Sequence, residues 1–175
     1  MYRYIDTRHK TFISFYHKDE YYKNYLETHF SNVIINKSVE DGDYDPDNSD
    51  EYIKYLIRNE KITDASVVVV LVGQETKYRK HVDWEIYAGL DRKAGGISGL
   101  VGILLPGSIR LINGWYDYDL PARLNDNVES GYAKLYTWDT AINNFKAIID
   151  EAFDNRIALD YKACNRREQM KRNLN

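Results

Sequence analysis

The most constraining feature of this sequence is a run of apolar, mostly β-branched residues before its midpoint. Positions 66–72 read Ser-Val-Val-Val-Val-Leu-Val and contain no charged side chain. β-branched residues favour strands, and an apolar run without alternation is typical of a parallel strand that helices cover on both faces. A chain with such a strand is expected to form a layered α/β domain.

Strand and helix patterns alternate along the rest of the chain. Further strands are predicted at residues 11–15, 33–35, 100–105 and 133–137. Helices are predicted from Asp19, from one of the candidate caps Asn48, Ser49 and Asp50, and at residues 82–94 and 141–153. Five strands in this arrangement predict a single doubly wound, flavodoxin-like parallel sheet with the order 2-1-3-4-5. Ligands would then meet residues 16–19 and 73–78, at the carboxyl ends of strands one and three.

The composition favours one domain and indicates neither a nucleic-acid nor a membrane partner. The 175 residues carry a formal net charge of −3 and no Pro-rich or Gly/Ser-rich linker. We therefore expect one domain at residues 1–160 and a charged extension at 161–175 that frays or continues the last helix. The balanced charge and short apolar runs predict neither a nucleic-acid nor a membrane partner, and an N-terminus without an apolar leader predicts a cytoplasmic protein. The lone Cys164 and four histidines without ligand spacing predict no metal site.

The usual ligand motifs of this fold class are missing from the predicted crevice. No glycine-rich dinucleotide loop or Walker loop is present, and strand three is followed by Gly73 rather than by a phospho-acceptor aspartate. Aromatic and carboxylate side chains remain. Tyr78, His81 and Glu85 are spaced by three and four residues, which places them on one face of a helix beside the crevice.

Several segments resemble the TIR-like family of prokaryotic antiphage defence, in particular the Thoeris nucleotide-signal synthases. The similar segments are residues 11–15 followed by Asp19, 66–73 with Thr76, Val-Asp-Trp-Glu-Ile at 82–86, 100–107, 120–127, Gly131-Tyr132 and Tyr-Thr-Trp at 136–138. Together they cover nearly the whole chain. The resemblance implies an enzyme that cleaves the nicotinamide–ribose bond of NAD, and it places the catalytic glutamate of the family at Glu85.

This resemblance also implies a biological setting. NAD would be the substrate and no further cofactor is expected. Capture of the ribosyl intermediate by water gives ADP-ribose, whereas capture by the substrate's own adenine or ribose gives a cyclic signal, which is the product we expect. The signal would act on a separate effector protein, in response to a phage-derived trigger, and the enzyme would form a homo-oligomer.

Seven further residues are candidates for substrate binding, each with a plainer alternative. Phe15 can stack on a base or pack in the core, and Asp19 can contact the substrate or cap the following helix. The remaining candidates are Tyr16 and His17 in the loop after strand one, the hydroxyls Ser14 and Ser38, and His81 one helical turn before Glu85. For Glu85 itself the alternative is a solubilising residue on an exposed helix face.

Two alternative functions remain open at this point. The first is a non-catalytic TIR-like interaction module, favoured by tyrosines outside the periodic core faces, namely Tyr116, Tyr118 and Tyr132. The second is a nucleoside deoxyribosyltransferase, which uses a similar fold and a glutamate on a glycosidic bond. Trp84 is expected to lie in the core or an interface because it points away from the Glu85 face. Residues 108–132 carry no pattern that assigns their fold.

Overall fold

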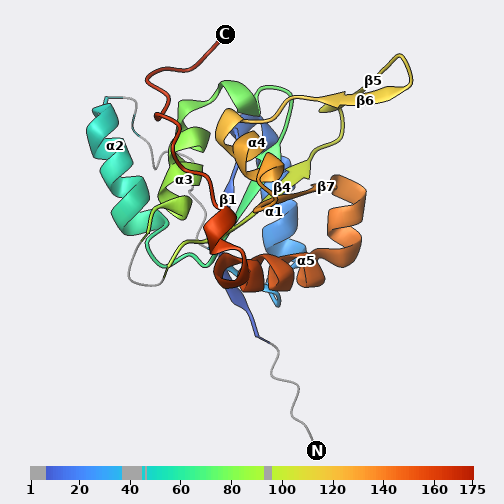
Figure 1. Ribbon diagram of the computed structural model, residues 1–175, viewed down its shortest axis with the longest axis horizontal. Helices are drawn as coiled ribbons and strands as arrows, with labels where there is room; N and C mark the ends of the chain where they lie inside the picture. Colours follow the sequence, from blue (N-terminus) through green and yellow to red (C-terminus); the bar gives the residue numbers. More distant parts are fainter. Residues whose placement is uncertain (1–6, 37–44, 46, 93–95) are drawn as a thin grey trace, which may run out of the picture.

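The computed structural model describes residues 7–36, 45, 47–92 and 96–175, and a five-stranded sheet forms its core (Figure 1). The strands are β1 (His9–Ser14), β2 (Ile34–Asn36), β3 (Val67–Val72), β4 (Gly99–Leu104) and β7 (Lys134–Thr137). They lie in the order β2-β1-β3-β4-β7, and every neighbouring pair is parallel. Counted along these five strands, this is the 2-1-3-4-5 order, so the prediction of a flavodoxin-like α/β fold is confirmed.

Helices cover both faces of this sheet. One face carries α1 (Glu20–His29) and α5 (Trp138–Ala158), and the other carries α2 (Asp50–Leu56), α3 (Lys80–Leu90) and α4 (Ala122–Glu129). Short helical turns complete the set: η1 (His17–Asp19), η2 (Ile57–Lys61), η3 (Thr76–Tyr78) and η4 (Asp160–Lys162).

Strand β3 explains why its sequence is apolar without alternation. All six of its residues are buried. Val68, Val70 and Val72 pack with the helices α2, α3 and α4, whereas Val67, Val69 and Leu71 pack with α1 and α5. Successive side chains on a strand point to opposite faces, so a strand covered on both sides needs an apolar residue at every position.

Local chemistry explains the helix boundaries. Ser49 is the cap of α2, because the amide of Tyr52 donates to its Oγ at 3.3 Å. Helix α3 begins at Lys80 and ends at Leu90, so it starts two residues before the predicted 82–94 span and stops short of its end. At the other face, a Cβ on Gly99 would lie 2.0 Å from the carbonyl oxygen of Ala152, so α5 approaches β4 as closely as glycine allows.

Residues 108–132 contain a hairpin and a helix that the sequence pattern did not assign. The strands β5 (Ile109–Ile112) and β6 (Trp115–Tyr118) pair antiparallel across Asn113 and Gly114, which both have positive φ, and the hairpin projects from the domain (Figure 1). Tyr116 is 77 % exposed, as expected. The expectation that Tyr132 is a surface aromatic is wrong: it is 2 % exposed and its hydroxyl donates to the Ser98 carbonyl at 2.6 Å.

The end of the chain neither frays nor continues α5. Helix α5 stops at Ala158, η4 follows, and the remaining segment runs back past α4 and α3 to the C-terminus (Figure 1). We call residues 163–175 the C-terminal strap. Its course is fixed by hydrogen bonds to both helices, among them the bond from the Trp84 indole to the Met170 carbonyl at 2.8 Å. Trp84 is 1 % exposed, which agrees with its predicted place in the core.

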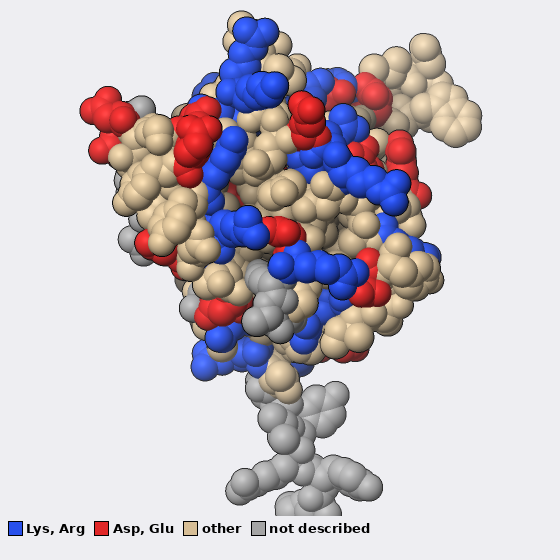
Figure 2. Space-filling view, turned by 60° about the vertical axis from the view of Figure 1, so that its left-hand side comes forward, with Lys and Arg blue, Asp and Glu red and all other residues tan. Residues whose placement is uncertain are grey.

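Surface charges are mixed rather than sorted by sign. Figure 2 shows basic and acidic side chains interspersed on one face, and exposed ion pairs such as Lys10–Asp64 and Arg167–Asp126 join them locally. Within the described part of the chain, no helix combines the length and apolar character that a membrane crossing requires.

Candidate active site at the β1–β3 switch point

Glu85 and Ser14 meet at the end of β1, where the order of strands in the sheet reverses. The Ser14 hydroxyl donates to Oε2 of Glu85 at 2.5 Å, a length typical of a hydroxyl bound to a carboxylate. Ser14 faces α3 because it alternates with Ile13, which packs on the opposite face of the sheet. Glu85 is 3 % exposed, so the alternative of a solubilising surface glutamate is wrong.

Asp19 extends this site towards β3. It occupies the N-cap position of α1, as the capping alternative predicted, but its side chain makes no capping hydrogen bond. The carboxylate instead lies against Gly73, where a Cβ would stand 2.2 Å from Oδ2, and it is hydrogen-bonded to Thr76. Burial raises the pKa of Asp19 above its ordinary value, with the Thr76 hydrogen bond acting in the opposite direction.

The mouth of the crevice carries a compact charged cluster. Nζ of Lys18 lies 2.6 Å from Oε1 of Glu75, and Arg79 forms an ion pair with the second oxygen of the same carboxylate. The Arg79 guanidinium stands 4.1 Å from the ring centroid of Tyr16, in cation–π contact. The hydrogen bond from Lys18 is the largest cause that holds the pKa of Glu75 below its ordinary value. The Glu75 carboxylate thus lies between two cations at the surface.

A polar cleft of about 360 Å³ adjoins this cluster. Its walls come from the carboxyl ends of β3 and β4 and from the base of the β5–β6 hairpin. The lining residues are Gly73, Gln74, Glu75, Gly107, Ser108, Arg110 and Asp119. This volume lies at the lower end of the range of small-molecule sites, and the position is where an open parallel sheet binds its ligands.

The other predicted residues lie at different distances from this centre. His17 is exposed beside Tyr16, with the ring centroids 4.2 Å apart. Phe15 packs on the α1–α5 face, away from the face that carries Glu85. His81 is half-buried against Trp84, and burial lowers the pKa of its imidazole. Ser38 lies outside the described residues.

The structure adds residues that the sequence left unnamed as site residues. Thr76 is fully buried and lies next to Asp19, Glu75 links the cations Lys18 and Arg79, and Gly73 leaves room for the Asp19 carboxylate. All lie within residues 73–79, which follow the strand end that predicted a ligand site. The sequence could not reveal this cluster, because the ion pair between Lys18 and Glu75 joins residues that are 57 positions apart.

Comparison with protein families gives one match. Residues 12–109, more than half of the chain, match the family described as the TIR-like domain of Thoeris protein ThsB. The matched span holds the second half of β1, the strands β2 to β4, helix α3, and the residues Ser14, Asp19 and Glu85. No curated protein gives a significant match to the chain.

Proposed function

Because the chain belongs to the TIR-like domain family of Thoeris protein ThsB, we propose that it is a defence enzyme that cleaves the nicotinamide–ribose bond of NAD. One observation carries this proposal. Glu85 is a buried carboxylate on α3 that Ser14 holds by a 2.5 Å hydrogen bond at the topological switch of the sheet. Burying a carboxylate has a cost in desolvation, and ionisable groups held in this way concentrate at functional sites.

One carboxylate is sufficient for the chemistry of this bond. Nicotinamide leaves as a neutral molecule from a pyridinium, so the leaving group needs no general acid. The ribose becomes electron-poor at its anomeric carbon as the bond breaks, and a carboxylate beside it stabilises that oxocarbenium-like centre or holds the ribose hydroxyls. In this proposal Ser14 sets the orientation of Glu85 through Oε2.

The charged cluster at the crevice mouth is where we place the pyrophosphate. Lys18 and Arg79 are already paired with an anion, the carboxylate of Glu75. A pyrophosphate would compete with Glu75 for these two cations and would gain charge-assisted hydrogen bonds from them. Tyr16, under the Arg79 guanidinium, would then border the path from the phosphates to Glu85.

The fate of the ribosyl group determines the signal. Water would give ADP-ribose, and the substrate's own adenine or ribose would give the cyclic ADP-ribose isomer that we expect. In this scheme the product activates a separate effector, a phage-derived trigger switches on synthesis, and the enzyme works as a homo-oligomer.

The test is nicotinamide release from NAD, followed by mass spectrometry with purified protein and with lysates from infected and uninfected cells. Glu85→Gln keeps the shape of the side chain and should abolish release. Glu60→Gln, the same change at an exposed position on η2, is the matched control and should keep it. Product mass separates hydrolysis from cyclisation. Activity on deoxynucleosides but not on NAD would support the deoxyribosyltransferase alternative instead.

A second function has its own observation. The β5–β6 hairpin exposes Trp115 by 79 %, Tyr116 by 77 % and Leu111 by 69 %, which is unusual for a surface without a partner. A non-catalytic interaction module would depend on this hairpin and not on Glu85. If defence in cells survives Glu85→Gln but is lost in Trp115→Ser, this second function replaces the first.

A further inference from the structure

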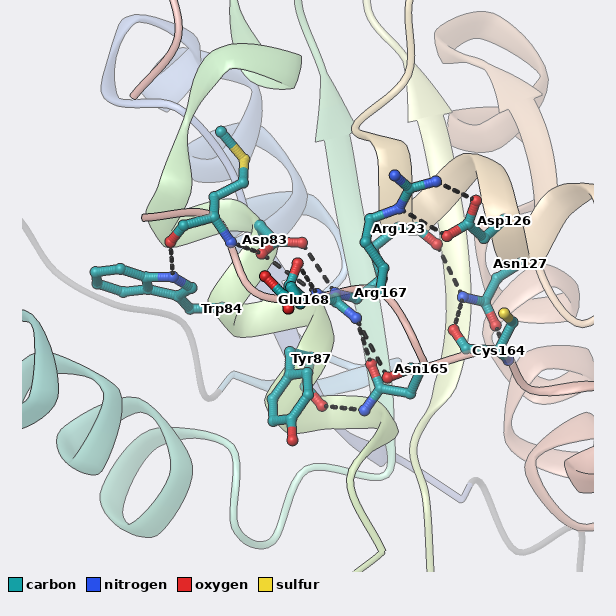
Figure 3. A network of polar contacts seen from close by, with 11 residues as sticks. Asp83, Trp84, Tyr87, Arg123, Asp126, Asn127, Cys164, Asn165, Arg167 and Glu168 are labelled. Atoms are coloured by element: carbon teal, nitrogen blue, oxygen red, sulfur yellow. Dashed lines mark hydrogen bonds and ion pairs between the residues drawn. The ribbon is translucent and has the colours of Figure 1, made fainter. Parts of the chain in front are cut away.

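The C-terminal strap runs antiparallel along the helix that carries Glu85. Asn165 Nδ2 donates to the Tyr87 carbonyl at 3.1 Å, the Met170 amide donates to Asp83 Oδ2 at 2.7 Å, and the Leu174 amide donates to the Tyr78 carbonyl at 2.9 Å. Residue numbers along the strap therefore increase while those of its partners decrease, from Tyr87 and Asp83 in α3 to Tyr78 in η3. Figure 3 shows the middle of this contact, where strap residues lie beside Asp83, Trp84 and Tyr87.

A buried ion pair joins the strap to α3 and α4. Nε of Arg123 donates to Asp83 Oδ1 at 2.9 Å, and the two side chains are 0 % and 5 % exposed. The strap satisfies further groups of the same pair: Asn165 Oδ1 accepts from Arg123 Nη1 at 2.9 Å, and the Glu168 carbonyl accepts from Nη2 at 3.2 Å. Buried charges need such complete hydrogen bonding, so the strap helps to stabilise the Asp83–Arg123 ion pair.

The strap also completes the start of α3. The N-cap residue Arg79 makes no side-chain capping bond. The amide of Lys80 instead donates to Oδ1 of Asn173 at 2.9 Å. Asn173, 93 positions away in the sequence, therefore accepts a hydrogen bond that a local N-cap side chain usually accepts. About one and a half turns of helix separate this contact from Glu85.

We propose that the C-terminal strap is a positioning element for Glu85, with Asn165 and Asn173 as its two anchors on α3. Asp83 and Glu85 are two residues apart, which is about 200° around an α-helix, so they point in nearly opposite directions. The strap therefore holds one side of α3 while Ser14 holds the carboxylate on the other. Release of the strap lets α3 rotate or shift, and a displacement of about 1 Å at a reacting group costs on the order of a hundredfold in rate.

This inference rests on the proposed NAD cleavage, and its test separates the two. The variant is Asn165→Ala/Asn173→Ala, which removes both anchors without mutating Asp83, Arg123 or Glu85. The matched control is Asn175→Ala, an exposed asparagine of the same strap. Three readouts are compared at a temperature where circular dichroism shows all proteins folded: kcat and KM for NAD, the NMR signal of the Trp84 indole N–H, which is bonded to the strap at Met170, and hydrogen exchange of the α3 amides.

The expected result is a fall in kcat of about tenfold or more with KM nearly unchanged, together with faster exchange at Lys80 and a shifted Trp84 indole N–H signal. Asn175→Ala should match the wild type. Unchanged kcat in a variant whose Trp84 indole signal shows a displaced strap would overturn the proposal. If the wild type releases no nicotinamide, NAD cleavage fails, and exchange alone decides: faster exchange of α3 amides in the double variant supports the positioning role, and identical exchange overturns it.

Discussion

Arg123→Met should be among the most destabilising single changes in this protein. The change preserves an apolar stem but leaves the Asp83 carboxylate, 5 % exposed, with the Met170 amide as its remaining described donor. Breaking a buried ion pair by removing one partner costs about 3–5 kcal/mol. For a chain of this length, about 2–4 °C of melting temperature corresponds to 1 kcal/mol, so the expected loss is about 6–20 °C.

Two further variants show whether the loss of stability comes from the burial of the ion pair or from the loss of charge alone. Arg167→Met removes a two-bond pair with Asp126, at 2.8 and 2.7 Å, but the arginine side chain is 47 % exposed, so the loss should stay below about 1 kcal/mol. Asp83→Leu/Arg123→Met removes both buried charges and should cost less than Arg123→Met alone. Urea unfolding followed by circular dichroism measures all three. Equal losses for Arg123→Met and Arg167→Met would refute the reasoning.

Three other predictions concern the sheet and the site. Gly99→Ala should destabilise the fold by about 1–3 kcal/mol in urea unfolding, because its Cβ would meet the Ala152 carbonyl oxygen at 2.0 Å and force α5 away. Burial raises the pKa of Asp19, so the protonated side chain stabilises the fold fully below the ordinary pKa of 3.8, and this contribution is lost as pH rises through the pKa of the folded state. Asp19→Asn should therefore gain stability relative to the wild type with rising pH. A constant difference in unfolding free energy across this range would contradict the assignment. Ser14→Ala should keep the fold, since it removes one hydroxyl, but should lower kcat for NAD by about tenfold or more through loss of the Glu85 orientation; an unchanged kcat would separate the serine from the chemistry.

Much of the fold could be predicted because local patterns and packing agree. The apolar run at β3 predicted a strand covered on both faces, and its alternate residues do pack with different helices. The hairpin was missed although Asn113-Gly114 is a strong turn signal, since the flanking residues lack the clear alternation that would have supported it.

The site was predicted in part, and the contacts that were missed join residues far apart in the sequence. Ser14 and Glu85 were both named from separate motifs, but their pairing spans 71 positions and cannot be read from either one. Asp19 matches the local preference of a helix cap, yet the room beside Gly73 draws its carboxylate away. The strap has a charged composition typical of solvated chain ends, and its partners on α3 and α4 are visible only in the fold.

The most direct test of the central claim is the rate of nicotinamide release from NAD by wild type, Glu85→Gln and Glu60→Gln, under a condition that activates the wild type. Our account predicts release by the wild type and by Glu60→Gln, with none above background for Glu85→Gln. Equal release by all three folded proteins, or no release by the wild type with purified NAD or in any lysate, would contradict the assignment of Glu85 as the catalytic residue of an NAD-cleaving enzyme.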